Sequence, residues 1–144
     1  MRVDPSQLRA FLLDSGLINS TQLAKAEKEA EQTNAKLADV LLKNNLIKEE
    51  ELTKLEAYIL GIPFVNLENE KISPDILQII PEPIAKKHNI VSFKKSGKNL
   101  EVAMLDPEDL QTIEFVKKKT NLRILPRLTS KNSIKDVLRQ YQKS

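Results

Sequence analysis

His88 is the one imidazole that could act as a general base in this chain of 144 residues. Cysteine is absent, so the chain offers no thiolate nucleophile and no cysteine-ligated zinc or iron–sulfur cluster. Any Ser-His-Asp arrangement would depend on His88, which follows Lys86 and Lys87 at the predicted end of a short helix. A cation suits that end of the helix dipole, so we interpret His88 as structural and predict no catalytic residue.

Phosphate chemistry would require glycine-rich loops, and the three glycines, Gly16, Gly61 and Gly97, lie far apart. Neither GxxxxGK[ST] nor GxGxxG occurs, so we expect no enzyme activity and no ATP binding from this chain. The turn at Asp106-Pro107 leads into a predicted helix and could bind an anion. Three carboxylates already occupy it, and they would repel a phosphate. We interpret this turn as a helix cap.

Metal binding has one acidic candidate, the run Glu49, Glu50 and Glu51. Consecutive helical residues point about 100° apart and cannot converge on one ion. We therefore predict no metal site and interpret the run as the solvated first turn of a helix.

Lysines are concentrated in two places, at 94–98 and at 117–119. Nucleic-acid binding is one interpretation of such runs, but aromatic residues make up only 4% of the chain and base stacking needs them. We favour solvated lysines with a docking role for acidic protein or lipid surfaces, and predict no nucleic-acid partner.

Composition is that of an ordinary soluble globular chain, with 40% apolar and 30% charged residues. No stretch approaches the roughly 20 apolar residues of a membrane span, so we expect a cytoplasmic protein. Charge is uneven: residues 1–60 carry 8 basic against 10 acidic side chains, and residues 61–144 carry 15 against 10. This asymmetry predicts two different units.

The first 60 residues contain a repeat. A shift of 29 positions aligns 8 identical residues among the 20 from Leu8 to Glu27. Apolar spacing within each copy is helical and predicts four helices, near 5–15, 20–33, 35–44 and 49–60. Gly16 and its counterpart Asn45 would end the first helix of each copy, and Asn19 with Gln22 would cap the second helix of the first copy.

After Gly61 the pattern changes, and short strands are predicted at 64–67, 90–94, 100–104 and 122–128. Predicted helices begin at Ser73, near Pro83, at Asp106-Pro107 and at Ser130. The fold class is therefore α+β. A helical tandem-repeat subdomain at 1–60 precedes a small α/β subdomain at 61–144, whose mixed sheet of three to four strands is flanked by helices.

The order of these motifs resembles the N-terminal domain of the GspE/PilB family, the hexameric ATPases of type II secretion and type IV pilus assembly. The resemblance spans essentially the whole chain and rests on QLRAFLLDSGLINSTQLAKA, KLADVLLKNNLIKEEELTKL, GIPFVNL, IPEPIAKKHNIVSF and LEVAMLDPEDL. It implies a non-catalytic docking or regulatory domain that couples the motor to its inner-membrane platform.

The partners that this resemblance implies are the platform protein of a secretion or pilus machine and a C-terminal ATPase module. It also implies a location in the cytoplasm, peripheral at the inner membrane through those partners, with no direct membrane insertion. No cofactor is expected in this chain, with one exception: a branch of the family binds cyclic di-GMP.

That branch uses two tandem copies of the motif RLGxxLxxxG(L/I)(L/I)xxxxLxxALxxQ. Carried over by position, the candidate ligand-binding residues are Leu8, Arg9, Leu12, Leu13, Gly16, Lys36, Leu37, Leu41 and Leu42. The polar positions depart from the motif: its Arg becomes Gln7 and Lys36, its first Gly becomes Arg9 and Ala38, the second Gly of copy two becomes Asn45, and its Gln becomes Ala30 and Ile59. We therefore favour a docking domain and keep cyclic di-GMP binding and nucleic-acid binding as alternatives.

Overall fold

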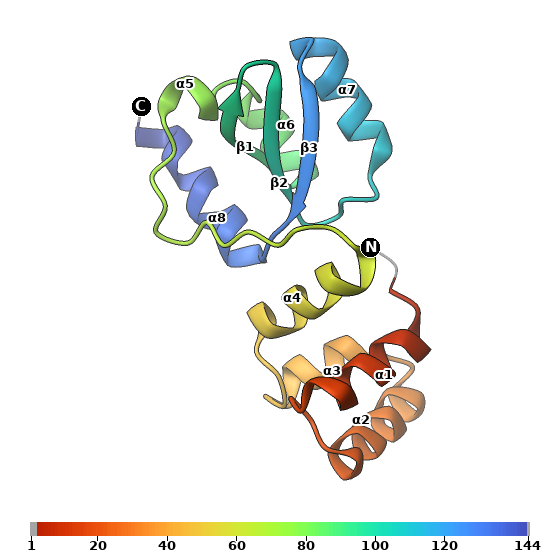
Figure 1. Cartoon of the computed structure of the whole chain (residues 1–144). Coiled ribbons are helices and arrows are strands. Elements are labelled where there is room, and N and C mark those ends of the chain that lie inside the picture. Colours follow the sequence, from red (N-terminus) through yellow and green to blue (C-terminus); the bar gives the residue numbers. More distant parts are fainter. Residues whose placement is uncertain (1–2, 144) are drawn as a thin grey trace. The chain divides into compact units, whose positions relative to one another are not determined.

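The computed structural model describes residues 3–143, and these divide into two compact units, one ending at Gly61 and the other beginning at Ile62 (Figure 1). The first unit is helical, and the second contains the sheet. No helix among the described residues combines the length and apolar character needed to cross a bilayer.

Four helices build the helical unit: α1 (Pro5–Ser15), α2 (Ser20–Thr33), α3 (Leu37–Lys43) and α4 (Glu49–Leu60). In the repeat, α3 is the counterpart of α1 and α4 that of α2. The largest helix contacts run between copies, with α1 packed on α4 and α2 on α3. Their shared core is apolar and includes Leu8, Leu12, Leu23, Val40, Leu41, Ile47 and Leu52.

Local residues set the helix ends as expected. Gly16 (φ 74°) and Asn45 (φ 56°) both adopt the left-handed conformation, and their N–H groups donate to Leu13 O (3.2 Å) and Leu42 O (3.1 Å). The Asn19 side chain accepts from Gln22 N at 2.8 Å, and the Gln22 side chain accepts from Asn19 N at 3.1 Å. The predicted helix at 35–44 is shorter by a few residues, at 37–43.

The second unit is built on a three-stranded mixed sheet of β1 (Ile90–Ser96), β2 (Asn99–Met104) and β3 (Arg123–Leu128), in that order. β1 and β2 form the antiparallel hairpin expected from the sequence. β3 runs parallel to β2 and is reached through α7 (Leu110–Thr120), which confirms the predicted crossover. The fold class is thus α+β, as predicted.

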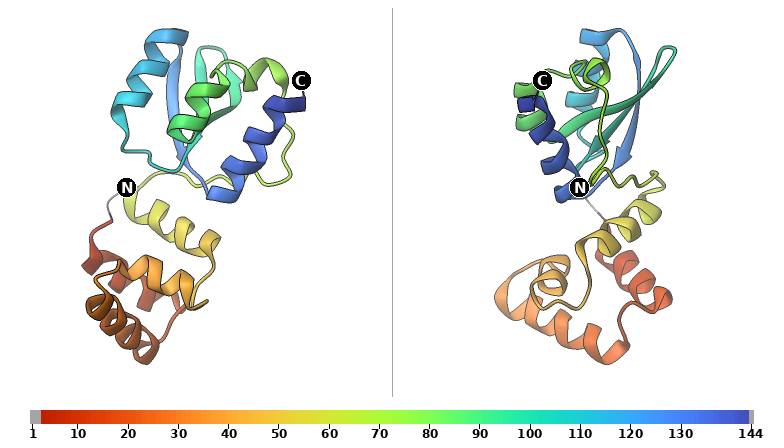
Figure 2. Two further views of the ribbon diagram at one scale, coloured as in Figure 1. Left: turned by 180° about the vertical axis from the view of Figure 1, so that it is seen from behind. Right: turned by 90° about the vertical axis from the view of Figure 1, so that its left-hand side faces the viewer.

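Helices α5 (Pro74–Leu77), α6 (Glu82–His88) and α8 (Lys131–Gln140) pack against β1, and α7 packs against β3. Seen from behind, α6, α7 and α8 lie in front of the sheet (Figure 2). The core between them is fully buried and includes Ala85, Ile90, Leu100, Val102, Met104 and Val137.

The strand predicted at 64–67 is absent as an element. Phe64 forms only an isolated parallel bridge to Leu128, with Val65 N donating to Leu128 O at 2.9 Å. Beyond that bridge, the Leu67 N–H donates to the Ser133 hydroxyl of α8 at 2.9 Å instead of to a neighbouring strand. After the bridge, a side chain therefore accepts the hydrogen bond that a neighbouring strand would have accepted, and the sheet has three strands.

The prediction that Asp106-Pro107 caps the following helix is also wrong. Asp109 caps α7, with its Oδ1 accepting from Thr112 N at 3.3 Å, and the helix begins at Leu110. Asp106 Oδ1 accepts from Glu108 N at 3.0 Å within the preceding turn. Asp106 thus stabilises the turn before the helix, and Asp109 caps the helix itself. Ser73 does stand at the N-cap of α5, but its side chain makes no capping hydrogen bond.

Candidate functional site

Most of the nine candidate ligand residues belong to the core of the helical unit. Leu8, Leu12 and Leu41 are buried, and Leu13, Leu37 and Leu42 are partly buried against the same cluster. Gly16 ends α1, and Arg9 and Lys36 are exposed. The structure thus brings the leucines together as packing, half-buries three of them, and leaves the two cations and the glycine backbone exposed at the surface.

Arg9 forms an ion pair that crosses from α1 to α2 of the first copy. Its Nε lies 3.3 Å from Glu27 Oε1 and 3.2 Å from Oε2. The family motif has glycine where Arg9 stands and leucine where Glu27 stands. Glu27 is not among the nine candidate residues, although the motif's leucine at this position was the signal that could have identified it. Two long charged side chains therefore meet where the motif provides bare backbone and an apolar surface.

The second copy differs, because its counterparts of Arg9 and Glu27 are Ala38 and Glu56. Ala38 carries no charge, and burial raises the pKa of Glu56. Lys36, at the motif's arginine position, stands exposed at the N-cap of α3. In the second copy a ligand phosphate would therefore meet Lys36. The nearby position that Arg9 occupies in the first copy is there Ala38.

Two surface cavities of the helical unit are related by the repeat. The first, of about 420 Å³, is lined by Gln22, Lys25, Ala26, Glu29, Asn44 and Leu46. The second, of about 310 Å³, is lined by Leu17, Glu51, Lys54, Leu55 and Tyr58. Every residue of the second is the counterpart, at a shift of 29, of a residue of the first. The two cavities therefore occupy equivalent positions in the two copies of the repeat.

The two cavities have diverged in chemistry. In the first, Glu29 accepts a hydrogen bond from Asn44 Nδ2 at 3.0 Å and lies 3.7 Å from Lys43 Nζ. Tyr58 takes the place of Glu29 in the second, and 72% of it is exposed. Its ring meets the Phe11 ring edge-on, with centroids 5.5 Å apart. We call Phe11, Leu17, Leu55 and Tyr58 the Tyr58 patch.

His88 forms no catalytic arrangement with Asp109 and Thr112, its polar neighbours. Its Nδ1 lies 4.0 Å from Asp109 Oδ2, and that same oxygen accepts from the Thr112 hydroxyl at 2.7 Å. The carboxylate stands between hydroxyl and imidazole, so the imidazole cannot take the hydroxyl proton.

The Glu49–Glu51 run forms local contacts: Glu51 accepts from Lys48 N at 3.1 Å, and Glu50 pairs with Lys54 at 3.8 Å. Within residues 3–143, no three metal-ligating side chains lie together.

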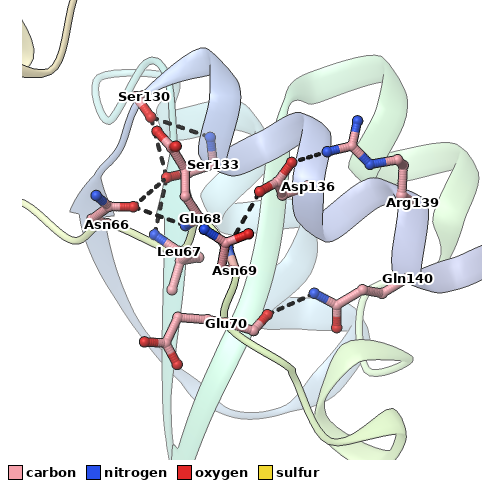
Figure 3. A network of polar contacts seen from close by, with 10 residues as sticks. All are labelled: Asn66, Leu67, Glu68, Asn69, Glu70, Ser130, Ser133, Asp136, Arg139 and Gln140. Atoms are coloured by element: carbon pink, nitrogen blue, oxygen red, sulfur yellow. Dashed lines mark hydrogen bonds and ion pairs between the residues drawn. The ribbon is translucent and has the colours of Figure 1, made fainter.

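A polar network on α8 holds the irregular segment 66–72 (Figure 3). Besides the Leu67–Ser133 bond, Asn69 N donates to Asp136 Oδ2 at 3.3 Å and Ile72 N donates to Gln140 Oε1 at 2.9 Å. Ser133 is fully buried. These side chains take the place of backbone partners, so the network is structural.

Comparisons with known proteins identify a domain family and several relatives of the chain. The MshEN domain family matches residues 60–144. The chain is 30% identical over 135 residues to the type IV pilus assembly ATPase PilB of Myxococcus xanthus, covering 94% of this chain and 24% of the relative. It is 28% identical over 135 residues to the PilB of Thermus thermophilus, covering 92% of this chain and 15% of the relative. The chain thus spans a quarter or less of these relatives.

Solved structures share the fold. A structure of MshE with cdg superposes with a TM-score of 0.72 at 24% identity, covering 93% of this chain and 97% of that one. The N-terminal domain of XpsE superposes with a TM-score of 0.62 at 20% identity, covering 97% and 96%. At these identities the likeness shows the fold alone.

Proposed function

Since the chain belongs to the MshEN domain family, we propose that it is a non-catalytic docking domain that couples a pilus or secretion motor to its inner-membrane platform. The family confirms the resemblance to GspE/PilB N-terminal domains that the tandem motifs indicate. ATP hydrolysis would belong to the part of the relatives that this chain does not match. In this proposal the domain works in the cytoplasm, at the membrane through its partners.

The Tyr58 patch carries this proposal. In the counterpart cavity Glu29 is engaged by Lys43 and Asn44, whereas Tyr58 stays 72% exposed. Exposed tyrosine beside apolar side chains is typical of the residues that dominate protein–protein binding energy. We take its occupant to be an amphipathic helix from the cytoplasmic region of the platform protein, with apolar side chains on Leu17 and Leu55 and polar ones toward Glu51 and Lys54.

A binding titration between this chain and the cytoplasmic region of its platform protein tests the proposal. Tyr58→Ala should weaken binding by about thirtyfold, the effect of losing an interface anchor worth about 2 kcal/mol. The matched control is Glu29→Ala, at the counterpart position of the first copy, which should leave affinity within about twofold. Equal losses in both variants, or no binding by the parent chain, would refute docking through this patch.

Cyclic di-GMP binding is a second candidate function, favoured by the fold shared with the MshE structure that contains cdg, which we read as cyclic di-GMP. In this chain the second copy fits it better than the first. Lys36 is exposed there, whereas Arg9 of the first copy is held by Glu27. Lysine gives a phosphate a point charge but lacks the two-pronged geometry of arginine.

A further inference from the structure

Six cationic side chains gather at one end of the sheet. They come from the β1–β2 hairpin, the last turn of α7 and the first residue of β3, namely Lys95, Lys98, Lys117, Lys118, Lys119 and Arg123. Arg123 N donates to Lys98 O at 2.7 Å, which places the start of β3 beside the hairpin tip. Lys98, Lys117 and Arg123 also line one cavity of about 630 Å³. We call these six residues the basic end.

Little negative charge offsets the basic end. All six side chains are exposed, and none of them forms an ion pair within residues 3–143. Glu114 lines the same cavity, and Glu101 is already shared between Lys94 (3.9 Å) and Arg127 (3.2 Å). Such a cluster produces a local positive field that attracts polyanions.

An exposed aromatic ring lies within this charge. α7 buries Thr112 and Val116, whereas Phe115 stays 50% exposed and Leu110 68% exposed. Lys119 Nζ lies 5.9 Å from the centre of the Phe115 ring. Lysines around an exposed apolar side chain are the composition of helix faces that lie on anionic bilayers.

Lipid headgroups fit these features better than nucleic acid or an acidic protein. Stacking of successive bases needs several exposed rings, and the other aromatic side chains of this unit, Phe64, Phe93 and Tyr141, are partly buried. Five of the six cations are lysines, whose point charges suit a diffuse layer of phosphates without fixed geometry. A bilayer also accepts a single ring such as Phe115 at any point of its surface.

We propose that the basic end and Phe115 bind the anionic headgroup surface of a membrane, with the ring entering the interface and no segment crossing the bilayer. This goes beyond docking on a platform protein, because the α/β unit then contacts the lipid itself. The Tyr58 patch belongs to the helical unit, so the two contacts can be tested separately.

Cosedimentation of the full chain with vesicles tests the proposal. The chain should sediment with phosphatidylglycerol vesicles and stay in solution with phosphatidylcholine vesicles, and high salt should release it because screening shortens the reach of the charges. Lys117→Gln, Lys118→Gln and Lys119→Gln together should weaken binding about a hundredfold, at about fivefold per cation near an anionic surface.

The matched control removes the same net charge elsewhere, through Lys28→Gln, Lys87→Gln and Lys135→Gln, all at exposed positions. It should lose less than about tenfold, and Phe115→Ser should lower binding several-fold without changing its salt dependence. Equal losses in the two triple variants would overturn the proposal, as would equal binding to both lipids. Binding to polyglutamate or DNA without binding to phosphatidylglycerol would assign the basic end to an acidic protein or a nucleic acid and overturn it too.

Discussion

Arg9 Nε of α1 lies 3.2 Å from Glu27 Oε2 of α2, so an ion pair spans the first copy where the family motif has glycine and leucine. The Arg9 and Glu27 side chains are 53% and 37% exposed, so solvent screens the pair and it adds no more than about 1 kcal/mol to stability. Its effect is to occupy the surface between the two helices. The two copies therefore offer different surfaces to a ligand.

Titration of the chain with cyclic di-GMP separates the two candidate functions. A pure docking domain should give no saturable heat at high ligand concentration. A receptor should give saturable heat that Lys36→Ala weakens at least tenfold, because a hydrogen bond to a charged group contributes about 1.5–3 kcal/mol. Lys28→Ala, on an exposed face of α2, is the matched control. Saturable heat that Lys36→Ala leaves unchanged would remove the second copy as the site.

Asn19→Ala should destabilise the helical unit by about 1 kcal/mol, since it removes the side-chain acceptor for Gln22 N. Asn19→Ser keeps an acceptor and should cost a few tenths at most. The chain has two tyrosines, so in a Tyr141→Phe background tyrosine fluorescence during urea unfolding follows Tyr58 and its unit alone. If Asn19→Ala left the free energy of unfolding unchanged, the capping box would make no contribution to the stability of the helical unit.

Ser133→Ala should destabilise the α/β unit by about 1–3 kcal/mol, because it leaves the Leu67 N–H buried without an acceptor. Ser73→Ala is the matched control: Ser73 is exposed and its hydroxyl caps nothing, so we expect a change below about 0.5 kcal/mol. Tyr141 fluorescence in a Tyr58→Phe background reports on this unit. Equal effects of the two serines would contradict the role given to the α8 network.

Alkaline stability should depend on Tyr141. Burial raises its pKa from 10.0 to about 12, and its hydroxyl donates to the Leu77 and Ile80 carbonyls at 3.0 and 2.7 Å. The unfolded chain therefore loses this proton first, so stability is intact below pH 10 and falls as the pH rises to about 12. The loss should be roughly 1–2 kcal/mol, because partial exposure screens the full effect. Urea unfolding of Tyr141→Phe should lack this step between the two pH values.

Local signals made the helical unit predictable. The bounds of α1, α2 and α4 agree with the sequence because Gly16, Asn19 and the repeated leucines act within a few residues of where they stand. The prediction of a strand at 64–67 was wrong because strand-like composition does not indicate whether a partner strand lies alongside. Ser133, 66 residues from Leu67 in the sequence, accepts the hydrogen bond of the Leu67 N–H instead.

The candidate site was less predictable than the fold. The motif singled out leucines because it records residue types at positions. Packing then buried Leu8, Leu12 and Leu41 and half-buried the other three. The Tyr58 patch combines side chains of α1, α4 and the turn after α1, so no single stretch of sequence displays it. The comparison of Glu29 with Tyr58 across the repeat was the one available signal.

Packing of α1 on α4 and of α2 on α3 means that neither copy completes its own core. A peptide with one copy would be left with a bare apolar face until it met a second peptide. Two such peptides should therefore associate, each covering the apolar face of the other. The short link from Asn34 to Lys36 joins the two copies in one chain, and it converts a concentration-dependent partnership into a permanent one.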